Sequence, residues 1–221
     1  ILNGYKMKMQ IYRNRRKDIK HTMEGQNKSL FQLFVPLCLE TIFYMLSGMV
    51  DTLMLSSVGD QAVGAVGTAN TYIGVFIIMY SVVSMGMLAV MTQNIGAGRP
   101  GIACQAKTLG LWFNGILGVV MSVFLFFCSD GILYVVGIAP ALKEPAVQYL
   151  RIVGGGSILN AMIPILAGYL RAFGYTKQPL IATVTGNILN FILNAVFLFH
   201  FHLGVQGVAS ATVISKVVNL I

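Results

Sequence analysis

Charged side chains are scarce in this sequence, and nearly half of them lie at one end. The 221 residues include only 15 Lys or Arg and 7 Asp or Glu, and ten of these lie within residues 1–28. Hydrophobic residues make up 56% of the chain, and the mean hydropathy is +0.76. A water-soluble surface cannot be built from so few charges. The composition therefore excludes a soluble globular domain and predicts an all-α polytopic membrane protein.

Cysteine is also rare, and the signatures of catalytic sites are missing. Cys38, Cys104 and Cys128 lie far apart, so they predict neither a disulfide framework nor a metal knuckle. The sequence has no HExxH, GxSxG or P-loop motif. We therefore expect no enzymatic activity, no cofactor and no structural metal.

The net charge of +8 comes largely from residues 1–28, directly before an apolar run. Basic residues in that position bind anionic lipid and fix topology, so the lipid bilayer is the expected partner and nucleic acid is not. Residues 1–28 are predicted to form a basic cytoplasmic segment. Because Met23 is suited to be an ordinary start, residues 1–22 are expected to be non-native.

Six apolar segments are long enough to cross a hydrocarbon core of about 30 Å. The predicted helices cover residues 30–55, 61–94, 102–128, 144–172, 178–199 and 205 to the end. Because Ile221 lies in an apolar stretch, we expect residues 29–221 to form a six-helix transmembrane unit cut within its last helix.

The basic residues of the connecting segments predict the orientation. With a cytoplasmic amino terminus, the inner side also receives Arg99, Lys107, Arg171 and Lys177, whereas the outer side receives only Lys143 and Arg151. The positive-inside rule favours this arrangement. The sequence predicts a multi-pass protein of the cell membrane with its amino terminus inside.

The first apolar segment carries an unusual polar stripe. Glu40, Tyr44, Ser47 and Asp51 share one helix face, with the two acids about 16 Å apart. A carboxylate at membrane depth must face protein, water or a cation, so the stripe is expected to face the bundle interior. Pro36, one turn before Glu40, removes a backbone hydrogen bond and lets the helix bend.

A second polar stripe follows the fifth segment, and a shorter polar face lies on the sixth. The residues are Thr183, Asn187, Asn190 and Asn194, and then Thr212, Ser215 and Asn219. Carboxylate, amide and hydroxyl oxygens suit a proton relay or Na⁺. Interhelical hydrogen bonding without further function is the alternative for any single Asn, Ser or Thr.

The stretch PLCLETIFYMLSGMVDTLMLSSVGDQAVGAVGTAN resembles the first two helices of the multidrug and toxic compound extrusion (MATE) family of cation-coupled antiporters. The resemblance continues through the QNIGAG segment, YLRI, LRAFGYTKQPL, NILNFILNAVFLF and GVQGVASATVIS. It implies the amino-terminal six-helix lobe of a twelve-helix transporter, with the carboxy-terminal lobe absent from this chain.

The resemblance also implies residue roles. Pro36 matches the proline at which the first helix bends, and Asp51 matches the acid implicated in H⁺ or Na⁺ binding. Asn190 and Thr212 match the asparagine and threonine of the same site. Asn194 replaces an aspartate of some members, and Glu40 is the candidate for a second acid. Tyr44, Ser47, Thr183 and Asn187 are the expected cavity lining.

The implied function is a secondary active multidrug exporter that exchanges organic cations or drugs for H⁺ or Na⁺ by alternating access. One alternative is a lipid-linked oligosaccharide flippase of the same superfamily, although its cavity needs more Lys and Arg than the predicted spans contain. The other alternative is a degenerate half-transporter that does not transport.

Overall fold

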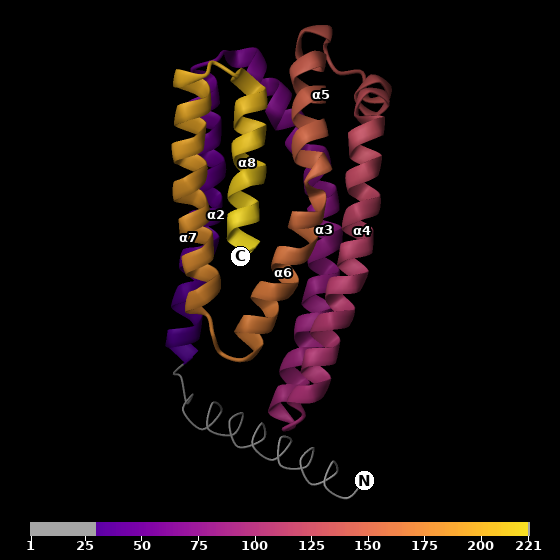
Figure 1. The fold of residues 1–221 in the computed structure, drawn as a ribbon, viewed down its shortest axis with the longest axis vertical. Coiled ribbons are helices and arrows are strands. Elements are labelled where there is room, and N and C mark those ends of the chain that lie inside the picture. The colour runs from indigo at the N-terminus through magenta and orange to yellow at the C-terminus, as the bar shows by residue number, and fades with distance from the viewer. Residues whose placement is uncertain (1–29, 221) are drawn as a thin grey trace, which may run out of the picture.

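The computed structural model describes residues 30–220, except for the side chains of Leu30 and Gln32. Within this range the chain is all helical and has no strand (Figure 1). The elements are α2 (Leu30–Ser56), α3 (Asp60–Gly96), α4 (Pro100–Val136), α5 (Pro140–Gly155), α6 (Ser157–Ala172), α7 (Lys177–Ala195), the π-helical turn η1 (Val196–His200) and α8 (Gly204–Leu220). The predicted cytoplasmic segment 1–28 lies outside the described residues.

The expected all-helical membrane fold is confirmed, with one span broken. Within residues 30–220, four helices are long and apolar enough to cross a membrane alone: α2, α3, α4 and α7 with η1. The bent pair of α5 and α6 adds a fifth candidate crossing if the two helices form one span. α8 is described over 17 residues, at the lower limit of what a crossing needs.

The third predicted helix, 102–128, was placed too short. α4 continues through Ser129, Asp130 and Gly131, which the sequence suggested as a connector. It ends where Gly137 adopts a left-handed conformation with φ 73° and its N–H bonds the carbonyl of Tyr134. This is the glycine cap that commonly terminates helices.

The prediction of one continuous helix over 144–172 was wrong. α5 begins earlier, at Pro140, and a bend of 43° at Gly156 separates it from α6. Three consecutive glycines, 154–156, weaken the helix at this point because glycine has low helix propensity. Gly154 also allows a close approach, since a Cβ added there would lie 2.8 Å from Leu125 Cβ on α4.

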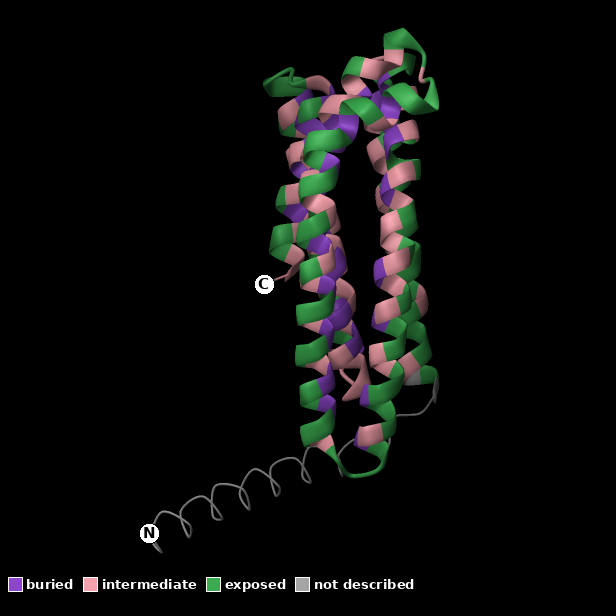
Figure 2. Ribbon diagram, turned by 90° about the vertical axis from the view of Figure 1, so that its right-hand side faces the viewer, coloured by how far each residue is buried: buried purple, intermediate pink, exposed green. Residues whose placement is uncertain are grey.

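The helices form two groups (Figure 1). α2, α7 and α8 make one group, and α3 to α6 make the other, with the contact between α5 and α8 as the main junction. Buried residues lie along the faces that the helices turn toward one another, and exposed residues cover the outer faces (Figure 2). The α3–α4 and α6–α7 connectors lie at one end of the bundle, and the α2–α3, α4–α5 and η1–α8 connectors lie at the other (Figure 1).

Candidate functional site

Asp51 on α2 faces two asparagines of α7. Its Oδ1 atom accepts a hydrogen bond of 2.6 Å from Asn194 Nδ2, which also donates to Asn190 Oδ1 at 3.2 Å. Asn194 is fully buried, and Asn190 is 4% exposed. The polar stripes on α2 and α7 therefore meet here, and the structure brings together three of the residues that the sequence nominated for cation coupling.

α5 and α8 complete this group. The Tyr149 hydroxyl of α5 lies beside the side chains of Asn70 and Thr212 and interacts electrostatically with Asp51. Tyr149 and Thr212 are both buried, and the Thr212 hydroxyl donates to the Val208 carbonyl at 2.9 Å. Sequence reasoning nominated Thr212 but used Tyr149 only as part of the YLRI motif.

The oxygens around Asp51 suit a proton or Na⁺. Asn194 Oδ1 is buried and has no hydrogen-bond partner, while Nδ2 of the same amide donates to Asp51. The group therefore contains an unsatisfied acceptor oxygen close to the carboxylate. Among the residues that the structure describes, no three His, Cys, Asp or Glu gather into a metal cluster. The group thus offers one carboxylate with neutral amide and hydroxyl oxygens, a donor set for a monovalent hard cation rather than for a transition metal.

Lys216 is a further charge near this site. It follows Thr212 by one helical turn on α8, so both residues share a face of that helix. Lys216 is half-buried and interacts electrostatically with Asp51. Lys216 was not among the residues predicted from the sequence, although its spacing of four residues from Thr212 on a helix was a signal for it.

The other stripe residues take different places. Asn187 Nδ2 donates to the Phe43 carbonyl at 2.8 Å, so this amide joins α7 to the backbone of α2. Tyr44 is 64% exposed, while Ser47 and Thr183 are half-buried. Tyr44 is thus the most open of the residues expected to line a cavity.

Glu40 lies apart from the Asp51 group. Its Oε1 atom is 2.5 Å from Arg171 Nη2 at the end of α6, and the Glu40 and Arg171 side chains are 16% and 25% exposed. Because a guanidinium already compensates this carboxylate, the structure does not make Glu40 the second acid of the coupling site. Pro36 is buried within α2, which continues through it as one helix.

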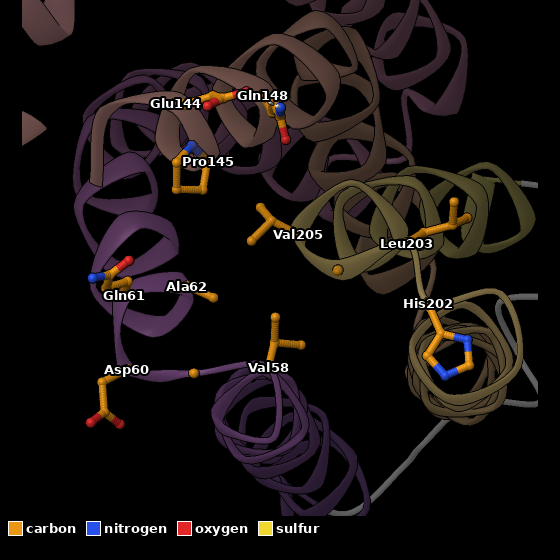
Figure 3. A pocket seen from close by; sticks show the side chains of 12 residues that line it. Val58, Asp60, Gln61, Ala62, Glu144, Pro145, Gln148, His202, Leu203 and Val205 are labelled. Atoms are coloured by element: carbon orange, nitrogen blue, oxygen red, sulfur yellow. Dashed lines mark hydrogen bonds between the residues drawn. The ribbon is translucent and has the colours of Figure 1, made fainter. Parts of the chain in front are cut away.

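A separate cleft of about 720 Å³ opens at the opposite end of the bundle from Arg171, between the α2–α3 connector, α5 and the start of α8 (Figure 3). Val58, Ala62 and Val205 point toward its centre, whereas Asp60 points away from it (Figure 3). Val58 follows Asp51 by seven residues and lies just beyond the end of α2. The apolar centre gives this cleft no set of converging cation ligands.

A bundle of apolar helices with a half-buried carboxylate between them defines a multi-pass membrane protein. The model of the MatE family matches residues 36–196, and the chain belongs to this family.

Named relatives support the same assignment. The chain is 34% identical over 197 residues to the "Uncharacterized transporter YisQ" of Bacillus subtilis, covering 87% of this chain and 43% of that protein. It is 29% identical over 200 residues to the "Probable multidrug resistance protein NorM" of Thermotoga maritima, covering 87% and 42%. The chain therefore spans less than half the length of these relatives.

Solved structures agree in fold. A MOP superfamily transporter from Pyrococcus furiosus, described as having a binding pocket of reverse polarity, superposes with a TM-score of 0.80 at 25% identity. The match covers 86% of this chain and 42% of that one. An outward-facing multidrug resistance MATE transporter gives the same TM-score, identity and coverage. The match to about half of each structure agrees with the expected single lobe of a longer transporter.

Proposed function

We propose that this chain is the amino-terminal lobe of a secondary active multidrug exporter in which H⁺ or Na⁺ binds at Asp51. The observation that carries the proposal is the Asp51 group, where a carboxylate between apolar helices is held by an amide at 2.6 Å and has no ion pair of its own. A carboxylate held in this way keeps its capacity for an external cation. The multidrug resistance names of several relatives support the transport class.

The proposed cycle follows from competition at one negative charge. A cation that binds Asp51 neutralises the carboxylate that attracts an organic cation, so binding of the two is mutually exclusive. Alternating access then requires only that the coupling cation and the cargo bind better to different conformations of the transporter. Asn190, Asn194 and Thr212 provide the neutral ligands, and Tyr149 borders them.

Organic cations with flat apolar bodies are the proposed cargo. Tyr44, which shares the α2 face that carries Asp51, is 64% exposed. Aromatic rings attract cations through their faces. The flippase alternative is disfavoured because Arg171 is paired with Glu40 and Lys216 interacts electrostatically with Asp51, so neither is an uncompensated cation for a pyrophosphate.

The proposed orientation places the α3–α4 and α6–α7 connectors in the cytoplasm. Arg99, Lys107, Arg171 and Lys177 lie on or next to these connectors, at the same end of the bundle (Figure 1). Under the positive-inside rule, this grouping of basic residues supports a cytoplasmic position for that end of the bundle. We propose the cell membrane as the location, with the amino terminus inside.

Dye efflux by the full-length protein in cells that lack other exporters tests the proposal. We expect Asp51→Asn to abolish efflux, because asparagine cannot exchange a proton or balance a bound Na⁺. The matched control is Asp60→Asn, since Asp60 is exposed at the start of α3 and points away from the cleft there. Undiminished efflux by Asp51→Asn would remove this residue from the coupling mechanism.

A further inference from the structure

The Glu40–Arg171 ion pair joins two helices whose backbones are not neighbours in the described part of the chain. Among the described residues, no Cα atom of α2 comes within 8 Å of a Cα atom of α6. The two long side chains bridge this space with a single contact of 2.5 Å. Within residues 30–220, this is the one ion pair that connects α2 to the group formed by α3 to α6.

The Glu40–Arg171 pair joins two opposite charges through a single hydrogen bond. Glu40 Oε2 and Arg171 Nε are both buried and have no hydrogen-bond partner. An arginine and a carboxylate that form a permanent link usually make two parallel hydrogen bonds. While the contact between these two largely buried charges is formed, it restrains α2 against α6. The unused acceptor on Glu40 and the unused donor on Arg171 leave the two side chains able to shift against each other.

The position of the pair on α2 connects it to the Asp51 group. Glu40 and Asp51 are eleven residues apart on one helix face, about 16 Å along the axis. α7 holds the same helix through Asn187 and Asn194. Pro36 lies one turn before Glu40, at a point where the helix lacks a backbone hydrogen bond and bends most easily.

We propose that Arg171 is a positioning residue for the helix that carries Asp51, acting through Glu40. The pair fixes the inner half of α2 against α6, and its separation lets α2 move with α7 relative to Tyr149 on α5. This role rests on the proposed function of Asp51, because it assigns to Arg171 the placement of that residue against its neighbours.

Cys38 offers a local reporter of this movement. It lies on α2 between Pro36 and Glu40 and is half-buried, with a free thiol. The experiment uses the full-length protein in membranes, with every other cysteine replaced, and measures the reaction rate of Cys38 with a small water-soluble methanethiosulfonate. We expect Glu40→Gln and Arg171→Gln each to raise the rate by about tenfold, the change that about 1.4 kcal/mol produces.

The control is Lys177→Gln, which removes an exposed cation at the start of α7. The exchange of Glu40→Arg with Arg171→Glu should return the rate toward that of the parent, and this variant keeps the test valid if a single substitution folds poorly. A positioning role also predicts that the single variants change the cation concentration for half-maximal efflux and that the exchange returns this concentration toward that of the parent. Single variants that react no faster than Lys177→Gln, or an exchange that reacts as fast as they do, would overturn the proposal.

The thiol measurement does not depend on transport. If Asp51→Asn leaves efflux unchanged while the labelling rates respond as expected, the proposed function fails and the contact between α2 and α6 stands as a restraint on α2. If Asp51→Asn abolishes efflux while the labelling rates do not respond, the proposed function stands and the role of Arg171 is overturned.

Discussion

The two acids of α2 lie on one helix face and have opposite surroundings. Glu40 meets a guanidinium directly at 2.5 Å, whereas the bond at Asp51 comes from a neutral amide, with Lys216 as a more distant charge. The protein's own cation thus satisfies the first acid directly, whereas the second has only a neutral hydrogen-bond donor in contact with it. Position in a membrane helix therefore does not define a coupling residue, because the groups on neighbouring helices decide the role of each acid.

The largest expected effect comes from removing the arginine that compensates the charge of Glu40. Arg171→Gln leaves Glu40 as an unpaired buried charge, which destabilises the protein by about 3–5 kcal/mol. Thermal unfolding of the solubilised full-length protein measures this. Combining it with Glu40→Gln should recover most of the loss, since no charge then remains unpaired. A double variant as unstable as the single one would show that the pair does not act through its charges.

A packing change away from both acids should affect stability but leave cation affinity unchanged. A Cβ added at Gly118 of α4 would lie 2.8 Å from Ile158 Cα, so Gly118→Ala must push α4 and α6 apart. We expect a loss of about 1–3 kcal/mol. The matched control is Gly115→Ala on the same helix, where a Cβ would meet nothing within 4 Å. Equal unfolding temperatures for the two variants would contradict the close approach of these helices.

Asn194→Asp sharpens the comparison by adding a second carboxylate to the Asp51 group. The asparagine now donates to Asp51, and an aspartate in its place needs a shared cation or proton to face that acid. We expect cation affinity to rise by about tenfold, measured as the cation concentration that gives half-maximal efflux. An unchanged concentration would place the coupling cation elsewhere.

Lys216→Gln should act in the same direction with a smaller effect. Lys216 does not touch Asp51, so its removal deletes a repulsion between the lysine and an incoming cation worth about 1 kcal/mol. Cation affinity should then rise by about fivefold. Lys177→Gln serves as the control for loss of a positive charge. Weaker cation binding by Lys216→Gln would mean that the lysine supports the site rather than competing within it.

The sequence predicted the helical class well because apolar run length requires only local information. It missed the break at Gly156 and predicted one continuous helix over 144–172, because GGGS is also compatible with a membrane helix and the close approach of Gly154 to Leu125 is a long-range contact. The bend also sets where α6 ends. For this reason the contact between Glu40 and Arg171, 131 residues apart, had no signal in the local pattern.

The site was more predictable than the long-range pairs. Helical spacing put Asp51, Asn190 and Asn194 on facing stripes, and the family resemblance selected them from other polar residues. Tyr149 was missed because a tyrosine near a helix end is usually an interfacial anchor, and its burial beside Asp51 depends on how α5 packs on α8.

The most direct test of the account compares the two acids in one assay of cation-driven efflux by the full-length protein. We expect the double variant Glu40→Gln with Arg171→Gln to retain efflux driven by the cation gradient, with a changed cation concentration for half-maximal efflux because α2 has lost its restraint. We expect Asp51→Asn, expressed at the same level, to lose cation-driven efflux. Loss of coupling in the double variant together with normal coupling in Asp51→Asn would contradict the assignment of Asp51 as the residue that binds the coupling cation.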